Sequence, residues 1–224
     1  MSNSNIHTGS NHSITLYHYW RSSCSWRVRW ALIHKGISFQ AIPVNLLNNE
    51  QNSSSFLKLN PGGYVPALQV GAEIFGESLA MLEWIEERFL DHPLLPTSVT
   101  DRMRVRQMCL MLISGTQPLQ NLAVMRKHSN DVNEQTNWSR FWIEKGLQKF
   151  NDVVRDSTGS FCFGGQFTLA DICLIPQLYN ARRFQVDLNQ FPLLTRIETN
   201  CLSLSSCKKS SPEQFQDKGP FLVC

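Results

Sequence analysis

The stretch Ile14-Thr-Leu-Tyr-His-Tyr-Trp-Arg-Ser-Ser-Cys-Ser-Trp-Arg-Val-Arg29 decides the fold of this chain. Its first six residues are β-branched and aromatic and alternate, which predicts a strand over 14–19. Val28, Ala31 and Leu32 then follow helical spacing, which predicts a helix over about 24–35 that ends at a glycine. Two serines and a cysteine occupy the turn between them. Because a helix that starts there directs free backbone N–H groups and a positive dipole outward, we expect a site for an anion, in particular a thiolate.

The elements continue to alternate as far as residue 90. Further strands are expected near 38–44, 66–70 and 73–75, a short helix or loop near 51–58, and a helix from Ser78 to about Phe89. The order βαβαββα predicts a mixed sheet with helices on its faces. The fold class is therefore α/β followed by all-α, with a thioredoxin-like domain over 14–90.

The second half of the chain has a helical period throughout. Residues 91–97 contain two prolines and are interpreted as an interdomain linker. Beyond them, helices are expected over roughly 98–127, 134–156 and 169–183, with a shorter one after Pro192. The domain over 98–224 is expected to be entirely helical and to end in a divergent tail from Cys201. Residues 1–13 are polar and are expected to form a disordered leader.

Composition excludes several classes of partner. The net charge is +3 and the basic residues are scattered, which disfavours nucleic acid. No apolar run reaches about 18 residues, so no membrane span is expected. Seven cysteines without regular spacing indicate reduced thiols in the cytoplasm rather than a disulfide framework, and no spacing suits a metal site.

Five short motifs, in the same order and spacing, resemble the zeta class of glutathione transferases. They cover roughly residues 14–198 and comprise Ser22-Ser-Cys-Ser-Trp-Arg-Val-Arg29, Asn60-Pro61 with Val65-Pro-Ala-Leu68, Glu77-Ser-Leu-Ala80, Gln117-Pro-Leu-Gln-Asn-Leu122, and Leu169-Ala-Asp171 with Pro176-Gln177 and Asn180-Ala-Arg-Arg-Phe184. The resemblance implies a homodimer that uses glutathione as cofactor. It also implies the thioredoxin-like fold already expected from the element order.

The activity that this resemblance implies is the cis–trans isomerisation of maleylacetoacetate to fumarylacetoacetate, in tyrosine and phenylalanine breakdown. The glutathione thiolate would add to the double bond of a small acidic electrophile, allow rotation and then leave. Two alternatives remain open: a transferase that conjugates glutathione to haloacids or other electrophiles, and a non-catalytic glutathione-binding protein. Consumption of glutathione would separate the first alternative from isomerisation.

Ser22, Ser23 and Cys24 have a structural and a functional interpretation. Serine is a favoured helix N-cap, worth about 1 kcal/mol. By resemblance, one hydroxyl instead donates a hydrogen bond to the glutathione sulfur, and Ser22 is the expected donor with Ser23 next. If that hydrogen bond lowered the thiol pKa from its ordinary value near 8.5 by about one to two units, the thiolate would rise from a few per cent to a large fraction at about pH 7. Cys24 is expected to modulate the site.

The remaining glutathione contacts are implied by resemblance. Val65, before a proline in a cis peptide, would present its backbone to the cysteinyl part, and Ser78 at a helix start would bind the γ-glutamyl carboxylate. Glu77 would face the ammonium group, although zeta-class proteins usually carry Gln there. Further expected cofactor-binding residues are Ser25, Trp26, Arg27, Gln51, Gln117 and Asn121.

Two motifs in the helical segment expected over 169–183 have separate interpretations. Arg183 matches the residue that orients the substrate carboxylate, although Arg182 is adjacent and could take that role. Thr168 and Asp171 have the spacing of a capping box and are interpreted as structural.

Overall fold

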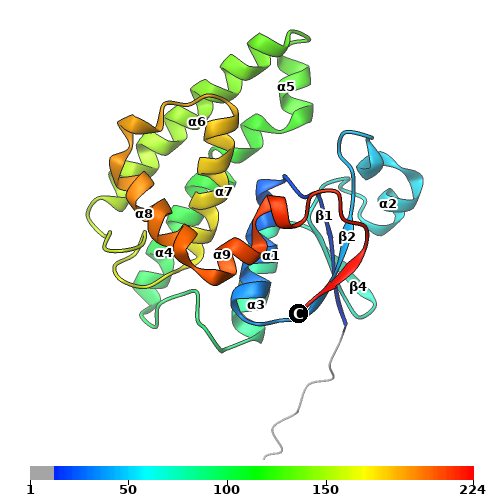
Figure 1. Ribbon diagram of the computed structural model, residues 1–224, viewed down its shortest axis with the longest axis horizontal. Helices are drawn as coiled ribbons and strands as arrows, with labels where there is room; N and C mark the ends of the chain where they lie inside the picture. The colour runs from blue at the N-terminus through cyan, green and yellow to red at the C-terminus, as the bar shows by residue number, and fades with distance from the viewer. Residues whose placement is uncertain (1–12) are drawn as a thin grey trace, which may run out of the picture.

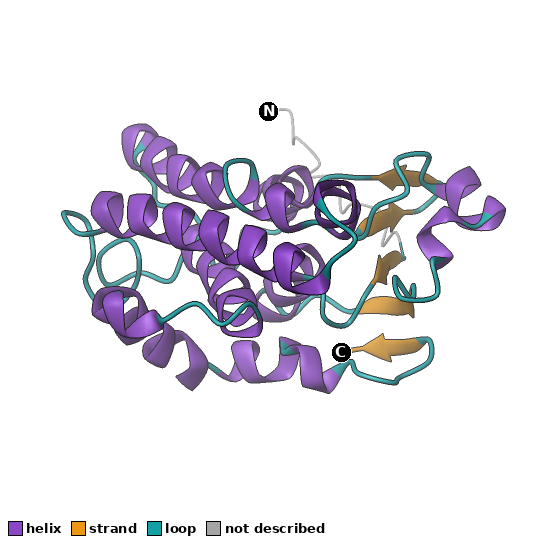
Figure 2. Cartoon of the chain, turned by 90° about the horizontal axis from the view of Figure 1, so that it is seen from above, coloured by secondary structure: helices purple, strands orange, loops and turns teal. Residues whose placement is uncertain are grey.

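The computed structural model describes residues 13–224, so the leader expected over residues 1–13 lies almost wholly outside the described residues. Its sheet has five strands in the order β4-β3-β1-β2-β5. These are β1 (Ile14–His18), β2 (Phe39–Pro43), β3 (Ala67–Val70), β4 (Glu73–Phe75) and β5 (Phe221–Val223). β1 pairs with β2 in parallel, with Leu16 opposite Ala41, and with β3 antiparallel. Figure 2 shows the strands at one end of the molecule and most of the helices at the other.

The thioredoxin-like domain adds α1 (Ser23–His34), η1 (Glu50–Asn52), α2 (Ser54–Leu59) and α3 (Ser78–Arg88). The alternating elements expected from the sequence are present, and the expected short helix divides into η1 and α2. Leu16 of β1 and Trp30 of α1 belong to one hydrophobic core with Leu82 of α3. This core continues into the helical domain, so the start of α1 is held rigidly between the two domains (Figure 1).

The helical domain contains α4 (Val99–Ile113), η2 (Gln117–Gln120), α5 (Leu122–His128), α6 (Val132–Val154), α7 (Leu169–Arg183), η3 (Leu188–Gln190), α8 (Pro192–Ser203), α9 (Ser205–Ser210) and η4 (Pro212–Gln214). The expectation of one helix over 98–127 is wrong. Pro118 has no N–H for an α-helical hydrogen bond, and the chain forms η2 there before α5 begins. Within residues 13–224, no helix is both long and apolar enough to span a membrane.

The expectation of an entirely helical tail is also wrong. Phe221–Val223 forms β5, which pairs antiparallel with β2 and places Val223 opposite Phe39 (Figure 1). The helix before it fixes this course, since α9 packs on α1 and Ser210 Oγ accepts a 3.0 Å hydrogen bond from Trp26 Nε1. A Phe-Leu-Val run has strong strand propensity, and the open edge of β2 supplies its partner.

A buried ion pair fastens the segment between α3 and α4. Lys35 Nζ lies 2.8 Å from Glu86 Oε2, with side-chain exposures of 0% and 6%. Lys35 also donates to the carbonyl oxygens of Phe89, Asp91 and His92. Glu86 accepts from the backbone N–H groups of Leu94 and Leu95. This one ion pair therefore fixes the backbone of the interdomain segment over residues 89–95.

The capping box predicted at Thr168 and Asp171 is present at the start of α7. Asp171 is fully buried and accepts hydrogen bonds from the N–H groups of Cys162 and Thr168, each at 2.8 Å. Its role is structural, because it fixes α7, the helix that carries Asn180 and Arg183.

Candidate functional site

A cavity of about 460 Å³ opens at the N-terminal end of α1, between the sheet domain and the helical domain. Residues from both domains line it. The lining includes these residues expected from the sequence: Ser22, Ser23, Cys24, Gln51, Val65, Glu77, Ser78, Gln117, Asn121 and Arg183. Segments distant in sequence therefore meet at one polar cavity.

Ser22 is the N-cap of α1, and its Oγ accepts a hydrogen bond of 3.2 Å from the backbone N–H of Ser25. A hydroxyl that accepts in this way keeps its own hydrogen for another partner. Ser23 is more buried, and its Oγ accepts from Asn180 Nδ2 at 3.5 Å. The structural and functional interpretations of Ser22 are therefore compatible, because capping uses a lone pair and leaves the donor free.

A chain of hydrogen bonds crosses the cavity floor from α1 to the helical domain. Arg27 Nη1 donates to Cys24 Sγ at 3.6 Å, and Cys24 Sγ donates to Gln117 Oε1 at 3.1 Å. Gln117 Nε2 then donates to Asn121 Oδ1 at 2.6 Å. These bonds fix how the Gln117 amide faces the cavity.

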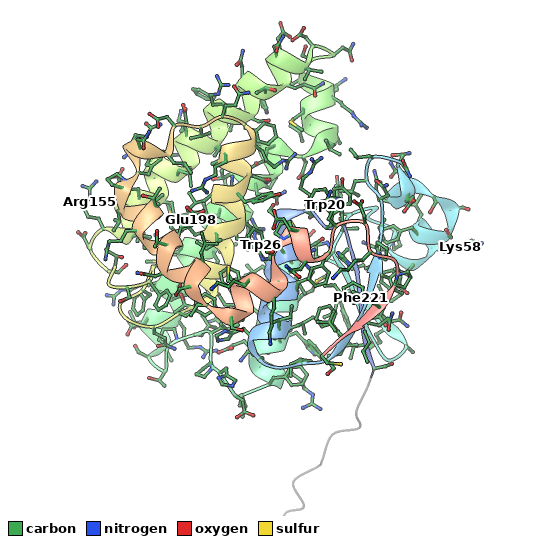
Figure 3. The ribbon with its side chains drawn as sticks, in the orientation of Figure 1. Trp20, Trp26, Lys58, Arg155, Glu198 and Phe221 are labelled. Carbon is green, nitrogen blue, oxygen red and sulfur yellow. The ribbon has the colours of Figure 1, made fainter. Side chains whose placement is uncertain are left out.

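The structure does not bring Ser25, Trp26 and Arg27 to the cavity wall. Ser25 Oγ accepts from the backbone N–H of Tyr19, and Trp26 packs where α1 meets α9 (Figure 3). Arg27 is fully buried beneath Cys24. Successive residues of a helix point about 100° apart, so only the first residues of α1 face the opening while the next three turn into the protein.

The opposite wall is built from the segment that leads into β3 and from the start of α3. The peptide bond between Val65 and Pro66 is cis, as the resemblance implied. Glu77 precedes α3 with φ of 64° and ψ of 108°, a conformation that a residue with a side chain rarely adopts. Ser78 begins α3 directly after it. Such strain, of order 1–3 kcal/mol, persists where the surrounding structure over-determines it, as at ligand sites.

The third wall of the cavity contains two arginines, Arg183 and Arg21, which lie near one another. Arg183 Nη1 donates to Asn180 Oδ1 at 2.9 Å, and its guanidinium lies 5.5 Å from the centre of the Phe184 ring. Burial, followed by the positive charge of Arg21, lowers the pKa of Arg183. Arg182 instead forms a two-pronged pair with Glu198 at 2.5 Å and lines no part of the cavity. Arg182 and Arg183, although adjacent in sequence, therefore have different roles: Arg182 pairs with Glu198, and Arg183 lines the cavity.

Sequence analysis missed Arg21 and Asn180 as cavity residues. Asn180 lies three residues before Arg183 on α7, a spacing that places both on one helix face and could have indicated it. Arg21 directly precedes the serine turn, but its approach to Arg183 depends on how the two domains pack. No local pattern encodes that packing.

The cavity suits glutathione, a tripeptide with a thiol, two carboxylates and an ammonium group. Gln51 Oε1 is buried at the cavity without a hydrogen-bond partner in the described part of the chain. The N-terminal ends of α1 and α3 offer unpaired N–H groups to anions, and Glu77 offers a carboxylate to a cation. These donors and acceptors complement the groups of the tripeptide.

Comparisons with known proteins agree with this geometry. Residues 21–88 match the family model "Glutathione S-transferase, N-terminal domain", and residues 142–198 match the corresponding C-terminal domain. A maleylacetoacetate isomerase of Dictyostelium discoideum is 38% identical, over 92% of this chain and 96% of that protein. A zeta-class glutathione S-transferase of Euphorbia esula is 40% identical, over 91% and 92%.

Solved structures are also similar. Maleylacetoacetate isomerase from Anaeromyxobacter dehalogenans, with GSH bound in its active site, superposes with a TM-score of 0.86 at 40% identity, covering 93% of this chain and 99% of that one. A bacterial zeta-class maleyl pyruvate isomerase gives a TM-score of 0.88 at 33% identity, covering 92% and 100%.

A thioredoxin-like domain followed by a helical domain, with a polar cavity between them at the start of α1, defines a glutathione transferase. Within that family, the chain belongs to the zeta class, as do the Euphorbia esula transferase and the bacterial maleyl pyruvate isomerase. It is an enzyme that uses glutathione as its cofactor.

Proposed function

We propose that the enzyme isomerises maleylacetoacetate to fumarylacetoacetate, a step of tyrosine and phenylalanine breakdown. The observation that carries this proposal is the pair Arg21 and Arg183 in one cavity with the serine turn. The substrate has a carboxylate at each end and a double bond between them. Two neighbouring cations suit such a dianion, because it relieves their mutual repulsion.

At the sulfur position, Ser22 is proposed as the principal donor, with Ser23 next. Bound glutathione supplies a thiolate, which adds reversibly to a conjugated double bond and leaves again. The free hydrogen of Ser22 and the N–H groups at the start of α1 favour that negative charge. Cys24 acts on the site through Gln117 and modulates it.

Arg183 is proposed to orient a substrate carboxylate, and Asn180 and Phe184 hold its guanidinium in place. Arg21 stabilises negative charge on the same side of the cavity. Because the cofactor is regenerated, the protein contributes orientation and charge stabilisation rather than a nucleophile of its own.

The glutathione backbone is proposed to lie against the wall formed by Val65, Glu77 and Ser78. Ser78 and the start of α3 would bind the γ-glutamyl carboxylate, and Glu77 its ammonium group. The free Oε1 of Gln51 would accept a hydrogen bond from an N–H group of glutathione. Gln117 and Asn121 would close the site from the helical domain.

A homodimer is also part of the proposal. Val99, Met103 and Leu110 are exposed by 82%, 63% and 46% and recur along α4 at helical spacing, which makes an apolar stripe without a partner in the described chain. A second copy would cover it. The free state of all seven cysteines supports a reducing, cytoplasmic setting.

The test measures kcat/KM for maleylacetone with catalytic glutathione, comparing Arg183→Gln with Arg182→Gln as the matched control. Loss of a charged hydrogen bond is worth about 1.5–3 kcal/mol, so Arg183→Gln is expected to lower kcat/KM roughly 10–150-fold. Arg182→Gln should change kcat/KM by less than about threefold when the rate is expressed per folded enzyme. Equal effects of the two substitutions would contradict the assignment of Arg183.

A further inference from the structure

Helix α1 buries two arginines completely, Arg27 and Arg29, and their surroundings differ. Arg29 donates to the carbonyl oxygens of Tyr19, Trp20 and Ser210 and lies 4.5 Å from the centre of the Phe215 ring. All of its nitrogens have partners, so its structural role is plain.

Arg27 has almost none of the hydrogen bonds and contacts that stabilise Arg29. Among the described residues, the Arg27 side chain makes one hydrogen bond, from Nη1 to Cys24 Sγ at 3.6 Å. Its Nε and Nη2 are buried without a hydrogen-bond partner, and it forms no ion pair within residues 13–224. A full positive charge therefore lies beneath the cavity floor without a carboxylate.

The titratable groups around Arg27 are thiols from three helices: Cys24 on α1, Cys109 on α4 and Cys173 on α7. Burial opposes ionisation of Cys173, yet a hydrogen bond from Cys109 and the charge of Arg27 together lower its pKa. The charge of Arg27 therefore acts in the direction that favours an anionic sulfur, second to the hydrogen bond from Cys109.

An unpaired buried charge opposes folding, and an apolar side chain of similar size is often tolerated better in its place. Stability alone does not explain an arginine at this position. What the arginine gives that an apolar side chain could not is a fixed positive charge and a directed donor at Cys24, which itself lines the cavity.

We propose that Arg27 is a positioning residue for sulfur chemistry: acting through Cys24, it orients the cavity floor and favours an anionic sulfur above it. Because Arg27 donates to Cys24 Sγ, the thiol hydrogen is directed to Gln117 Oε1, which in turn fixes the Gln117 amide. The charge also acts directly, since little water intervenes to screen it in the protein interior. This inference rests on the proposed site for the glutathione sulfur.

The test is the ionisation of glutathione bound to the enzyme, followed by thiolate absorbance as a function of pH, with no substrate present. Arg27→Met is expected to raise the titration midpoint by roughly one pH unit. Arg27→Lys, which keeps the charge, should restore at least half of that shift. The urea midpoint of unfolding for Arg27→Met should be equal to or above that of the unsubstituted protein, because the unpaired charge is gone.

A purely structural Arg27 would give the opposite pattern: lower stability in Arg27→Met and an unchanged thiolate midpoint, which overturns the proposal. If Arg27→Met does not fold, Arg27→Gln is measured in its place with the same criteria. Glutathione binding to the unsubstituted enzyme, measured by calorimetry, distinguishes a failure of the proposed function from a failure of the role of Arg27. Absence of binding there refutes the proposed function, whereas normal binding with an unshifted midpoint in the variants refutes only the role of Arg27.

Discussion

Replacing Lys35 by Met should be among the most destabilising single changes in this protein. The substitution leaves Glu86 as a buried carboxylate without its cation, and it removes the donor shared by Phe89, Asp91 and His92. Breaking a buried pair on one side costs about 3–5 kcal/mol.

For a chain of this size, 1 kcal/mol shifts Tm by about 2–4 °C, so Lys35→Met should lower Tm by roughly 6–20 °C. The exposed pair Arg104–Asp101, at 2.7 Å against 2.8 Å for Lys35–Glu86 but with side-chain exposures of 56% and 30%, supplies the matched control. Arg104→Met should change the unfolding free energy by less than about 0.5 kcal/mol. The contrast isolates burial as the cause, because both pairs have similar geometry.

Urea unfolding of Lys35→Met, Glu86→Gln and the double variant gives the coupling energy of the pair. We expect about 2 kcal/mol or more, since the double variant no longer holds an unpaired charge. A coupling below about 0.5 kcal/mol, or a single-variant loss no greater than that of Arg104→Met, would refute this account of how the interdomain segment is fastened.

Three further predictions concern the site, pH and the tail. Glu77→Gly should raise stability by up to about 1 kcal/mol by relieving the positive φ, yet weaken glutathione binding in calorimetry; tighter binding would contradict its role. Burial, followed by the nearby charges of His92 and Lys35, lowers the pKa of His34 to about 4, below its ordinary 6.5. The unfolded chain therefore binds more protons between these values, so stability should fall as pH drops from 6.5 to 4, by about 1–2 kcal/mol after allowance for partial exposure. In His34→Gln, the urea midpoint of unfolding should depend less on pH between 6.5 and 4, and an unaltered dependence would contradict this role of His34. Deleting residues 219–224 removes β5 and should lower the unfolding free energy by about 1–3 kcal/mol while kcat stays within twofold; a large loss of kcat would show that the strand serves the site.

Local signals in the sequence predicted the parts of the structure that local forces determine. The alternation over 14–19, the serine turn and the helical period after it gave β1, the N-cap and α1. The capping box at Thr168 was likewise visible, because its two partners are three residues apart. The helical period over 98–127 was also visible, but the structure ends α4 at Ile113, before Pro118, and begins α5 only after it.

The rest depended on contacts between distant segments. Phe221–Val223 becomes a strand because α9 brings it to the open edge of β2, which the tail sequence does not encode. Trp26 and Arg27 belong to the serine motif in sequence, yet helical rotation turns them into the interior. The approach of Arg21 to Arg183 joins residues more than 160 positions apart and follows from domain packing alone.

The central claim is that glutathione is a recycled cofactor held at the start of α1. The most direct measurement is free thiol, titrated while the purified enzyme consumes maleylacetone in the presence of limiting glutathione. We predict that the cis isomer disappears over many turnovers while the thiol concentration stays constant. Thiol that falls in step with the substrate would contradict the account and make this chain a conjugating transferase.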